Sequence, residues 1–235
     1  MKAASVLFAC LTAIALQGGA IISAAASNDV HVSAWLLKQE ITGWGKQDIL
    51  FNDRAVRVDD SLRHYTMLAR APDWTVTYFS TERKRISSQP YAQYDGGLAR
   101  RLAVISTALA GSENLSKITG WERQGQQLYC DHSCDVWALP KKLALARQMA
   151  SYKMMEAPDL CKASQVSIIL AKQISVPSFG RPCVFFQRGN NKPSILLQTL
   201  SIKKVSVPLS RFEIPKNYAA TTPEKVMFDR QEFDF

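Results

Sequence analysis

The sequence predicts an α+β fold, a curved and half-open antiparallel β-barrel of about eight to eleven strands wrapped around a few helices. Three observations predict it. Apolar residues alternate with period two over residues 31–80, helical spacing replaces that period in the middle of the chain, and alternation returns in the last third. A wide antiparallel sheet can leave one face in water, but helices or a ligand must cover the other.

The first 26 residues have the pattern of a secretory signal peptide. A short positive start, Met1-Lys2, precedes an apolar run from Ala3 to Ala15, which Gln17-Gly18-Gly19 interrupts. Small residues from Ser23 to Ala26 follow, as at a cleavage site. We expect cleavage near Ala26 and a periplasmic or secreted protein. Cys10 after Leu7-Phe8-Ala9 leaves lipid anchoring open as an alternative.

Removing 26 of the 235 residues leaves 209, enough for one domain over residues 27–218 and a polar tail over 219–235. The chain has 29 Lys and Arg residues against 20 Asp and Glu residues. The leader contains one of these charged residues, Lys2, so the mature chain has a net charge of +8. This balance favours anionic partners, such as a membrane surface approached through Lys203-Lys204. The basic residues lie in scattered pairs without interleaved aromatics, so nucleic-acid binding is not expected. No mature apolar run reaches about 18 residues, so no membrane span is expected.

The first half of the chain predicts a meander. Its expected strands cover residues 31–41, 48–52, 55–59, 64–70 and 74–80. Alternate positions of these strands are apolar or aromatic, which places them on one face of the sheet. These positions are Trp35, Leu37, Ile41, Tyr65, Met67, Trp74, Val76 and Tyr78.

The middle of the chain changes period. Leu98, Leu102, Ile105 and Leu109 have helical spacing, and Gly111 suits the end of that helix. Short strands are expected over 117–121, 126–129 and 135–139, followed by helices over 141–156 and 158–174. The second of these helices also has the composition of a strand at residues 166–170. The last third predicts strands over 182–188, 194–201 and 202–207, and irregular structure from residue 219.

Four cysteines remain after the leader: Cys130, Cys134, Cys161 and Cys183. An even count in an exported chain indicates two disulfides, with three possible pairings. Short loops favour Cys130–Cys134 and Cys161–Cys183. A metal site around Cys130 and His132 is the alternative, but C-x₃-C is not the usual zinc spacing and export favours oxidation, so we expect no metal.

No catalytic motif stands out. The nucleophile elbow, the P-loop and the zinc-protease helix are absent from the sequence. His31, His64 and His132 are expected to be surface or turn residues. The neighbouring carboxylates of Asp59-Asp60, and of Asp131 with Asp135, are candidates for acid–base chemistry, although adjacent Asp residues more often form turns. We expect that the protein is not an enzyme and that it binds no cofactor.

The apolar strand positions, together with Met149 and Tyr152, have two interpretations. They form an ordinary core, or they line a cavity between a curved sheet and its helices that suits an acyl chain. Methionine thioethers adapt to irregular partners, which is consistent with the second interpretation.

Three segments resemble the periplasmic lipoprotein-carrier (LolA-like) superfamily, including its uncharacterised exported branches. Trp35 to Asp59 is similar to the opening strands, Tyr65 to Tyr78 to the next hairpin, and Ser201 to Tyr218 to the closing segment with Pro208, Phe212 and Pro215-Lys216. The resemblance implies an incomplete barrel with a hydrophobic concave face, and carriage of lipid or lipid-modified proteins. The four cysteines and the longer middle depart from the carriers proper.

The leading hypothesis is therefore an exported, non-enzymatic and monomeric protein that binds lipid or lipoprotein acyl chains. An envelope protein–protein interaction module without a ligand is the alternative, and an envelope hydrolase is a further one.

Overall fold

The computed structural model describes residues 29–96, 118–146, 151–189 and 193–228. Within these ranges, twelve strands form one sheet in the order β12-β6-β5-β4-β3-β2-β1-β11-β10-β9-β8-β7. The strands are β1 (His31–Ile41), β2 (Gly45–Asn52), β3 (Ala55–Asp60), β4 (Tyr65–Arg70), β5 (Val76–Ser80), β6 (Arg85–Gln89), β7 (Glu122–Tyr129), β8 (His132–Ala138), β9 (Tyr152–Glu156), β10 (Cys183–Arg188), β11 (Ser194–Pro208) and β12 (Ala219–Ala220). The sheet is open, with β12 and β7 at its edges.

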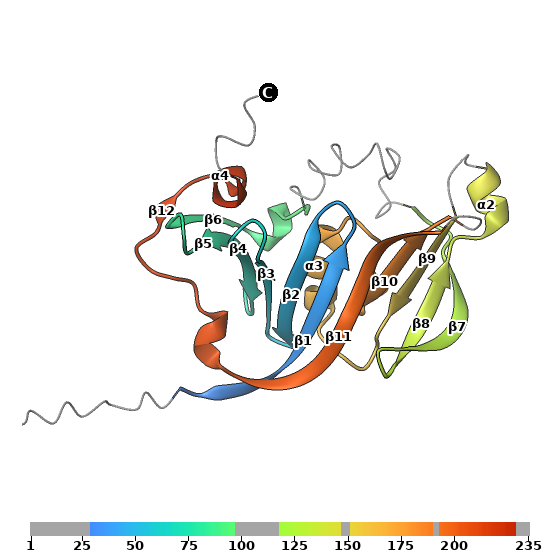
Figure 1. Cartoon of the computed structure of the whole chain (residues 1–235), viewed down its shortest axis with the longest axis horizontal. Coiled ribbons are helices and arrows are strands. Elements are labelled where there is room, and N and C mark those ends of the chain that lie inside the picture. Colours follow the sequence, from blue (N-terminus) through green and yellow to red (C-terminus); the bar gives the residue numbers. More distant parts are fainter. Residues whose placement is uncertain (1–28, 97–117, 147–150, 190–192, 229–235) are drawn as a thin grey trace, which may run out of the picture.

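Helices are few. They are α2 (Lys141–Ala146), α3 (Ser164–Gln173) and α4 (Pro223–Met227), with 3-10 turns η1 (Tyr91–Gln93) and η3 (Leu209–Phe212). The sheet curves around α3, and α4 lies over β5 and β6 (Figure 1). This arrangement confirms an α+β fold built on a curved, open and mostly antiparallel sheet, in which β12 pairs parallel with β6. No helix that the structure describes is long and apolar enough to cross a membrane.

The first and last long strands join the two halves of the sheet. β1 pairs antiparallel with β2 on one side and with β11 on the other. The pairing of β1 with β11 runs from His31 opposite Pro208 to Ile41 opposite Leu197. A bulge interrupts the β1–β11 register between Lys38 and Gln39. Because β11 forms hydrogen bonds with β1, the fold depends on contacts between residues more than 150 positions apart in the sequence.

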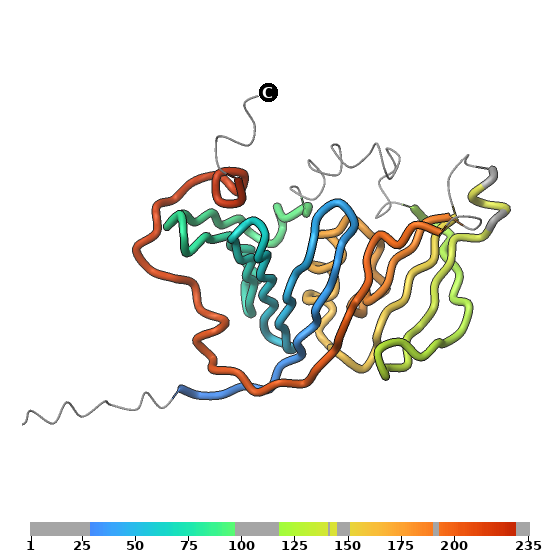
Figure 2. Tube along the Cα trace, in the orientation of Figure 1, coloured from blue at the N-terminus to red at the C-terminus, as the bar shows by residue number. Residues whose placement is uncertain are grey.

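The meander β1–β5 has two apolar faces, because many of its strand positions on both sides are hydrophobic. One face, which we call the helix-covered face, packs against α3 and α4. The opposite or outer face carries Leu50, Leu68 and Phe79, which pack with Phe212 of η3. Figure 2 shows the C-terminal segment leaving β11 and returning along this side of the sheet to α4. Both faces are therefore covered by the chain itself.

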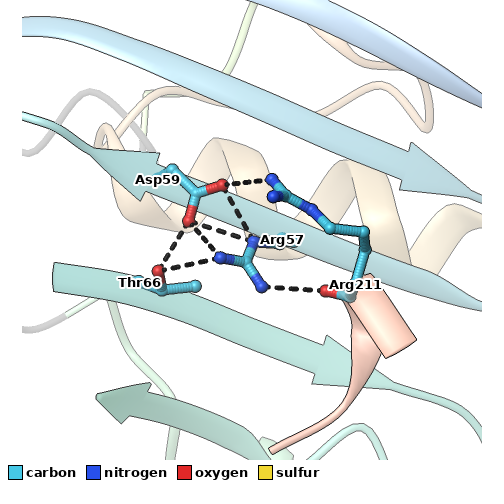
Figure 3. A network of polar contacts seen from close by, with 4 residues as sticks. All are labelled: Arg57, Asp59, Thr66 and Arg211. Atoms are coloured by element: carbon cyan, nitrogen blue, oxygen red, sulfur yellow. Dashed lines mark hydrogen bonds and ion pairs between the residues drawn. The ribbon is translucent and has the colours of Figure 1, made fainter. Parts of the chain in front are cut away.

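Polar side chains also fasten the C-terminal segment to the outer face. The carboxylate of Asp59 on β3 accepts hydrogen bonds from the guanidinium of Arg57, at 2.8 Å, and from the hydroxyl of Thr66, at 2.6 Å. It also accepts one from Arg211 at 3.3 Å, while Arg57 donates to the Arg211 carbonyl oxygen at 2.9 Å (Figure 3). One carboxylate thus joins two strands to η3.

The predictions of two helices and of the C-terminal tail differ from the structure. The helix expected over 141–156 is only α2, followed by strand β9, because β8 and β10 provide pairing partners on both sides of residues 152–156. The helix expected from 158 begins at Ser164. The irregular tail expected from 219 forms β12 and α4, because Val226 and Met227 are buried in the core.

Other predicted elements have different outcomes. The strand expected over 126–129 begins at Glu122, and the two strands expected over 194–201 and 202–207 are one strand, β11. The helix expected around Leu98–Leu109, and Met149, lie outside the described residues.

Candidate functional site

The helix-covered face brings most of the predicted lining residues together. One continuous buried cluster contains Leu37, Tyr65, Met67, Trp74, Val76 and Tyr78, and the partly buried Trp35 packs against it. Ile41 and Tyr152 belong instead to a second cluster, with Phe186 and Leu197. The period-two alternation therefore predicted that Leu37 of β1, the two β4 positions and the two β5 positions share a face, whereas Ile41 packs in the second cluster.

Side chains from α3 and α4 occupy this face. Val166, Ile169 and Leu170 of α3 pack in the cluster, and so do Val226 and Met227 of α4, which are 0% and 1% exposed. Phe228 and Tyr94 belong to the same cluster. Neither α4 nor the burial of Tyr94 was predicted from the sequence. Pro223 at the first helical position, followed by the apolar residues 226–228, was the signal that marks such a helix.

Three tyrosines give this face its polar groups. Tyr65 and Tyr78 lie with ring centroids 6.2 Å apart, and the Tyr94 hydroxyl donates to the Met67 sulfur at 3.6 Å. Burial raises the pKa of Tyr78 to about 12 and raises the pKa of Tyr65 and of Tyr94 well above the ordinary value. All three are neutral phenols at physiological pH, so they supply hydrogen bonds but no charge.

The four cysteines are free thiols in this structure. Cys130 and Asp131 both have positive φ, 48° and 64°, and form the two-residue turn between β7 and β8. The hairpin register places Gln127 opposite Cys134. A disulfide between Cys130 and Cys134 does not match that register, and the predicted Cys161–Cys183 pair is not joined either.

Each thiol has a raised pKa. Burial, followed by a neighbouring carboxylate, raises the pKa of Cys134 to about 11 and the pKa of Cys161 to about 12, and it also raises the pKa of Cys130 and Cys183. The Cys161 sulfur lies 3.3 Å from Asp53 Oδ1. Since the thiolate is the nucleophile, these thiols are not activated for attack at neutral pH.

The candidate acid–base carboxylates are held in structural contacts. Asp59 belongs to the Arg57 network described above. Asp60 accepts hydrogen bonds from the Trp44 indole at 2.7 Å and from Arg63. Burial alone would raise the pKa of Asp135 on β8, but its ion pair with Arg123 lowers that pKa. Asp131 is in the β7–β8 turn. The structure does not direct these carboxylates toward a common point.

The histidines also have local partners. The ring nitrogen Nδ1 of His132 lies 2.7 Å from Asp159 Oδ2, and the His132 ring packs edge-on against Trp35 at 5.4 Å. His31 contacts the backbone of Asp29, and His64 lies 3.6 Å from Glu82. Among the described residues, no three His, Cys, Asp or Glu side chains converge as a metal site would require.

The predicted basic pair of β11 is divided between two faces. Lys203 lies opposite Leu36 and Lys204 opposite Trp35, so successive side chains point to opposite sides of the sheet. The Lys204 ammonium lies 6.0 Å from the Trp35 ring centroid, on the helix-covered side. Both lysines are exposed, but they do not form one patch.

Comparison with known proteins gives no family. No family model matches the chain, and no curated protein matches its sequence. An uncharacterized conserved protein from Thermus thermophilus has a TM-score of 0.34 at 7% identity, over 83% of this chain and 91% of that chain. MucB, in complex with MucA(peri), has a TM-score of 0.33 at 13% identity, over 81% of this chain and 57% of that chain. Such weak similarities carry no argument about function.

Proposed function

We propose that this chain is an exported, non-enzymatic protein that binds a hydrophobic ligand, a lipid or the acyl chains of a lipoprotein, on the helix-covered face. The position of α4 is the observation that carries the proposal. A short apolar segment at the end of the chain, Val226 to Phe228, lies in the same cluster as Tyr65 and Tyr78. A face that buries this segment offers the same apolar area to a ligand once the segment leaves.

α4 is a short helix that is attached to the sheet mainly through its apolar side chains. The helix has five residues, too few to be stable in isolation. Two guanidinium groups hold it, Arg83 donating to the Val226 carbonyl oxygen and Arg85 to that of Lys225, each at 3.2 Å. β12, which precedes it, has two exposed residues. Displacing α4 leaves the sheet from β1 to β11 paired.

The free energies of apolar burial allow an acyl chain to compete with α4 for this face. Burial of a Val, Met or Phe side chain contributes about 1.5–3 kcal/mol, so the three together contribute about 5–9 kcal/mol. Each buried methylene contributes about 0.8 kcal/mol, so about 6–11 methylenes offset the loss of α4. A fatty acyl chain of ordinary length has more than this. The three neutral tyrosine hydroxyls would supply hydrogen bonds to its polar end.

The proposal is tested with a fluorescent fatty acid and the full chain. Met227→Gln weakens the apolar contacts of α4, and we expect it to increase fatty-acid affinity about tenfold over the unmodified protein, the equivalent of about 1.4 kcal/mol. Lys225→Gln is the matched control, because that side chain is exposed on the same helix. Mass spectrometry of protein purified from its own host should also find bound lipid. No uptake by either variant, together with no lipid from the host, would contradict the proposal.

A protein partner is the second candidate, and the edge strand β7 favours it. Residues 122–128 of β7 are exposed, and β8 is the one neighbour of β7 in the sheet that the structure describes. An exposed edge can accept an added strand, although the bulge between Arg123 and Gly125 opposes continuous pairing. Affinity capture from the periplasm with and without detergent distinguishes the two candidates. A partner retained in detergent, with no bound lipid, would favour the interaction module.

A further inference from the structure

The carboxyl group of Glu156 is buried at the end of β9, where it is 1% exposed. Glu156 lies opposite Asp135 of β8 and opposite Cys183 of β10. Its Oε1 accepts a hydrogen bond of 2.9 Å from the backbone N–H of Phe179, in the loop that joins α3 to β10. A titratable group thus holds a loop in place.

Phe179 covers an aromatic surface. Its ring stacks on Trp137, with centroids 4.0 Å apart and planes at 20°, and meets Trp121 edge-on at 6.3 Å. The indole Nε1 atoms of both tryptophans are buried and have no hydrogen-bond partner among the described residues. Phe179 itself is 36% exposed, so it is the outermost ring of the three. Movement of this loop would uncover the ring surfaces of Trp137 and Trp121 that Phe179 contacts.

The surroundings of Glu156 favour its neutral form while the loop is closed. Asp135 and Cys183 face the Glu156 carboxyl from the neighbouring strands, and Arg181 is the cation in the loop that joins α3 to β10. The Arg181 guanidinium donates to the Cys161 carbonyl oxygen at 3.2 Å. Burial is the largest effect and the Asp135 carboxylate adds to it, so the pKa of Glu156 rises to about 7, against smaller opposing effects of the Phe179 N–H and of Arg181.

We propose that Glu156 makes the loop over residues 177–182 a pH-sensitive cover, which lifts Phe179 from Trp137 and Trp121 when this carboxyl loses its proton. The direction follows from linkage. The closed loop keeps the carboxyl away from water and binds its proton more tightly than the open loop, where water solvates the carboxylate. A rise in pH therefore shifts the population toward the open loop.

The loop geometry permits this motion. Gly180 has φ +94° with no heavy atom within 4 Å of a Cβ built on it, so open space lies beside the backbone there. The Gly180 N–H donates to the Ser178 hydroxyl within the loop. Arg181, through the Cys161 carbonyl oxygen, and Pro182, whose carbonyl oxygen accepts from the Ala157 N–H at 3.1 Å, hold the end of the loop, so the motion is centred on Phe179 and Gly180. Opening requires the Phe179 contacts to be lost but leaves the strands β9 and β10 paired.

The experiment measures the intrinsic tryptophan fluorescence of the full chain from pH 5 to pH 9. We expect one transition near pH 7, its loss in Glu156→Gln, and its loss in Trp137→Phe. Glu82→Gln is the matched control, because Glu82 is an exposed glutamate, and it should keep the transition. An unchanged transition in Glu156→Gln, or no transition in the unmodified protein, would overturn the proposal.

Hydrogen exchange of the unmodified chain keeps the test decisive if Glu156→Gln does not fold. After correction for the intrinsic pH dependence of exchange, the opening equilibrium at the Phe179 amide should increase about tenfold from pH 6 to pH 8, from a closed-loop pKa of about 7 and an ordinary value of 4.5 when open. Constant protection of this amide over that range would reject the proposal.

Discussion

The indole nitrogen of Trp44 donates a hydrogen bond of 2.7 Å to Oδ2 of Asp60, and the Arg63 guanidinium lies 3.9 Å from the Trp44 ring centroid. Arg63 also donates to both carboxylate oxygens of Asp60, from its backbone N–H at 2.9 Å and from Nη1 at 3.2 Å. A buried carboxylate, an indole and a guanidinium thus fix the turn after β1 and the turn after β3 to each other.

Removing this carboxylate should destabilise the fold. Asp60→Ala leaves the Trp44 N–H and the Arg63 guanidinium without their acceptor, so we expect a loss of about 2–4 kcal/mol in the free energy of unfolding. Chemical denaturation measures it. Asp48→Ala, at an exposed position of β2, is the control and should change stability by less than about 0.5 kcal/mol. Equal losses in both variants would contradict the assigned role.

The Asp59 network predicts a salt-dependent contribution from the C-terminal segment. Asp59→Ala removes the acceptor shared by Arg57, Thr66 and Arg211, and we expect a loss of about 1–2 kcal/mol, since the group is partly exposed and screened by solvent. Denaturation at low and high salt should show a smaller loss in high salt. Glu213→Ala, exposed on the same segment, should be nearly neutral. A salt-independent loss would argue against an electrostatic cause.

Gly96 allows a close approach between the end of the η1 loop and α3. A Cβ built at this position would lie 1.8 Å from the Lys172 carbonyl oxygen, and its φ is +73°. Gly96→Ala should therefore lower the free energy of unfolding by about 3 kcal/mol or more, since backbone atoms must move. Gly125→Ala, where φ is +119° but no heavy atom lies within 4 Å, is the control for φ strain and should cost about 1 kcal/mol. Similar losses of stability in the two variants would show that small movements relieve the clash at Gly96.

The raised pKa of Glu156 predicts a pH-dependent stability. The unfolded chain ionises this carboxyl at about pH 4.5, whereas the folded chain keeps the proton until about pH 7. Between these values the folded state binds more protons, so its stability is greatest below pH 4.5 and falls by about 3 kcal/mol as the pH rises to 7. Glu156→Gln should remove this part of the curve in denaturant titrations. A curve of unchanged slope would show that other groups cause it.

The thiols predict an order of alkylation. In the reduced native protein at about pH 8, Cys130 should react with iodoacetamide first, because it is only partly buried, and the buried Cys161 and Cys183 should react last. Peptide mass spectrometry measures the order, with the denatured protein as the control in which all four react alike. Thiols that react only after a reductant is added would instead support the disulfides predicted from the sequence.

Local patterns explain what could be predicted. Tyr65, Met67 and Tyr78 share a face in the structure because adjacent strand residues always point to opposite sides. Met154 and Met155 fit a helix in the sequence, yet they lie in β9 because β8 and β10 pair with it. The same limit applies to Val226 and Met227, whose burial depends on strands far earlier in the chain.

The α+β class, the meander from β1 to β5 and the residues that alternate onto one face could all be read from the order of the residues, because they follow from the geometry of a single strand. Three features required the folded chain: α3 and α4 cover this face, Gln127 rather than Cys130 lies opposite Cys134, and Glu156 is buried beneath the loop of Phe179. Register, burial and the pairing of β1 with β11 depend on contacts between residues that are distant in the sequence. A local sequence pattern does not show the free energies of such contacts.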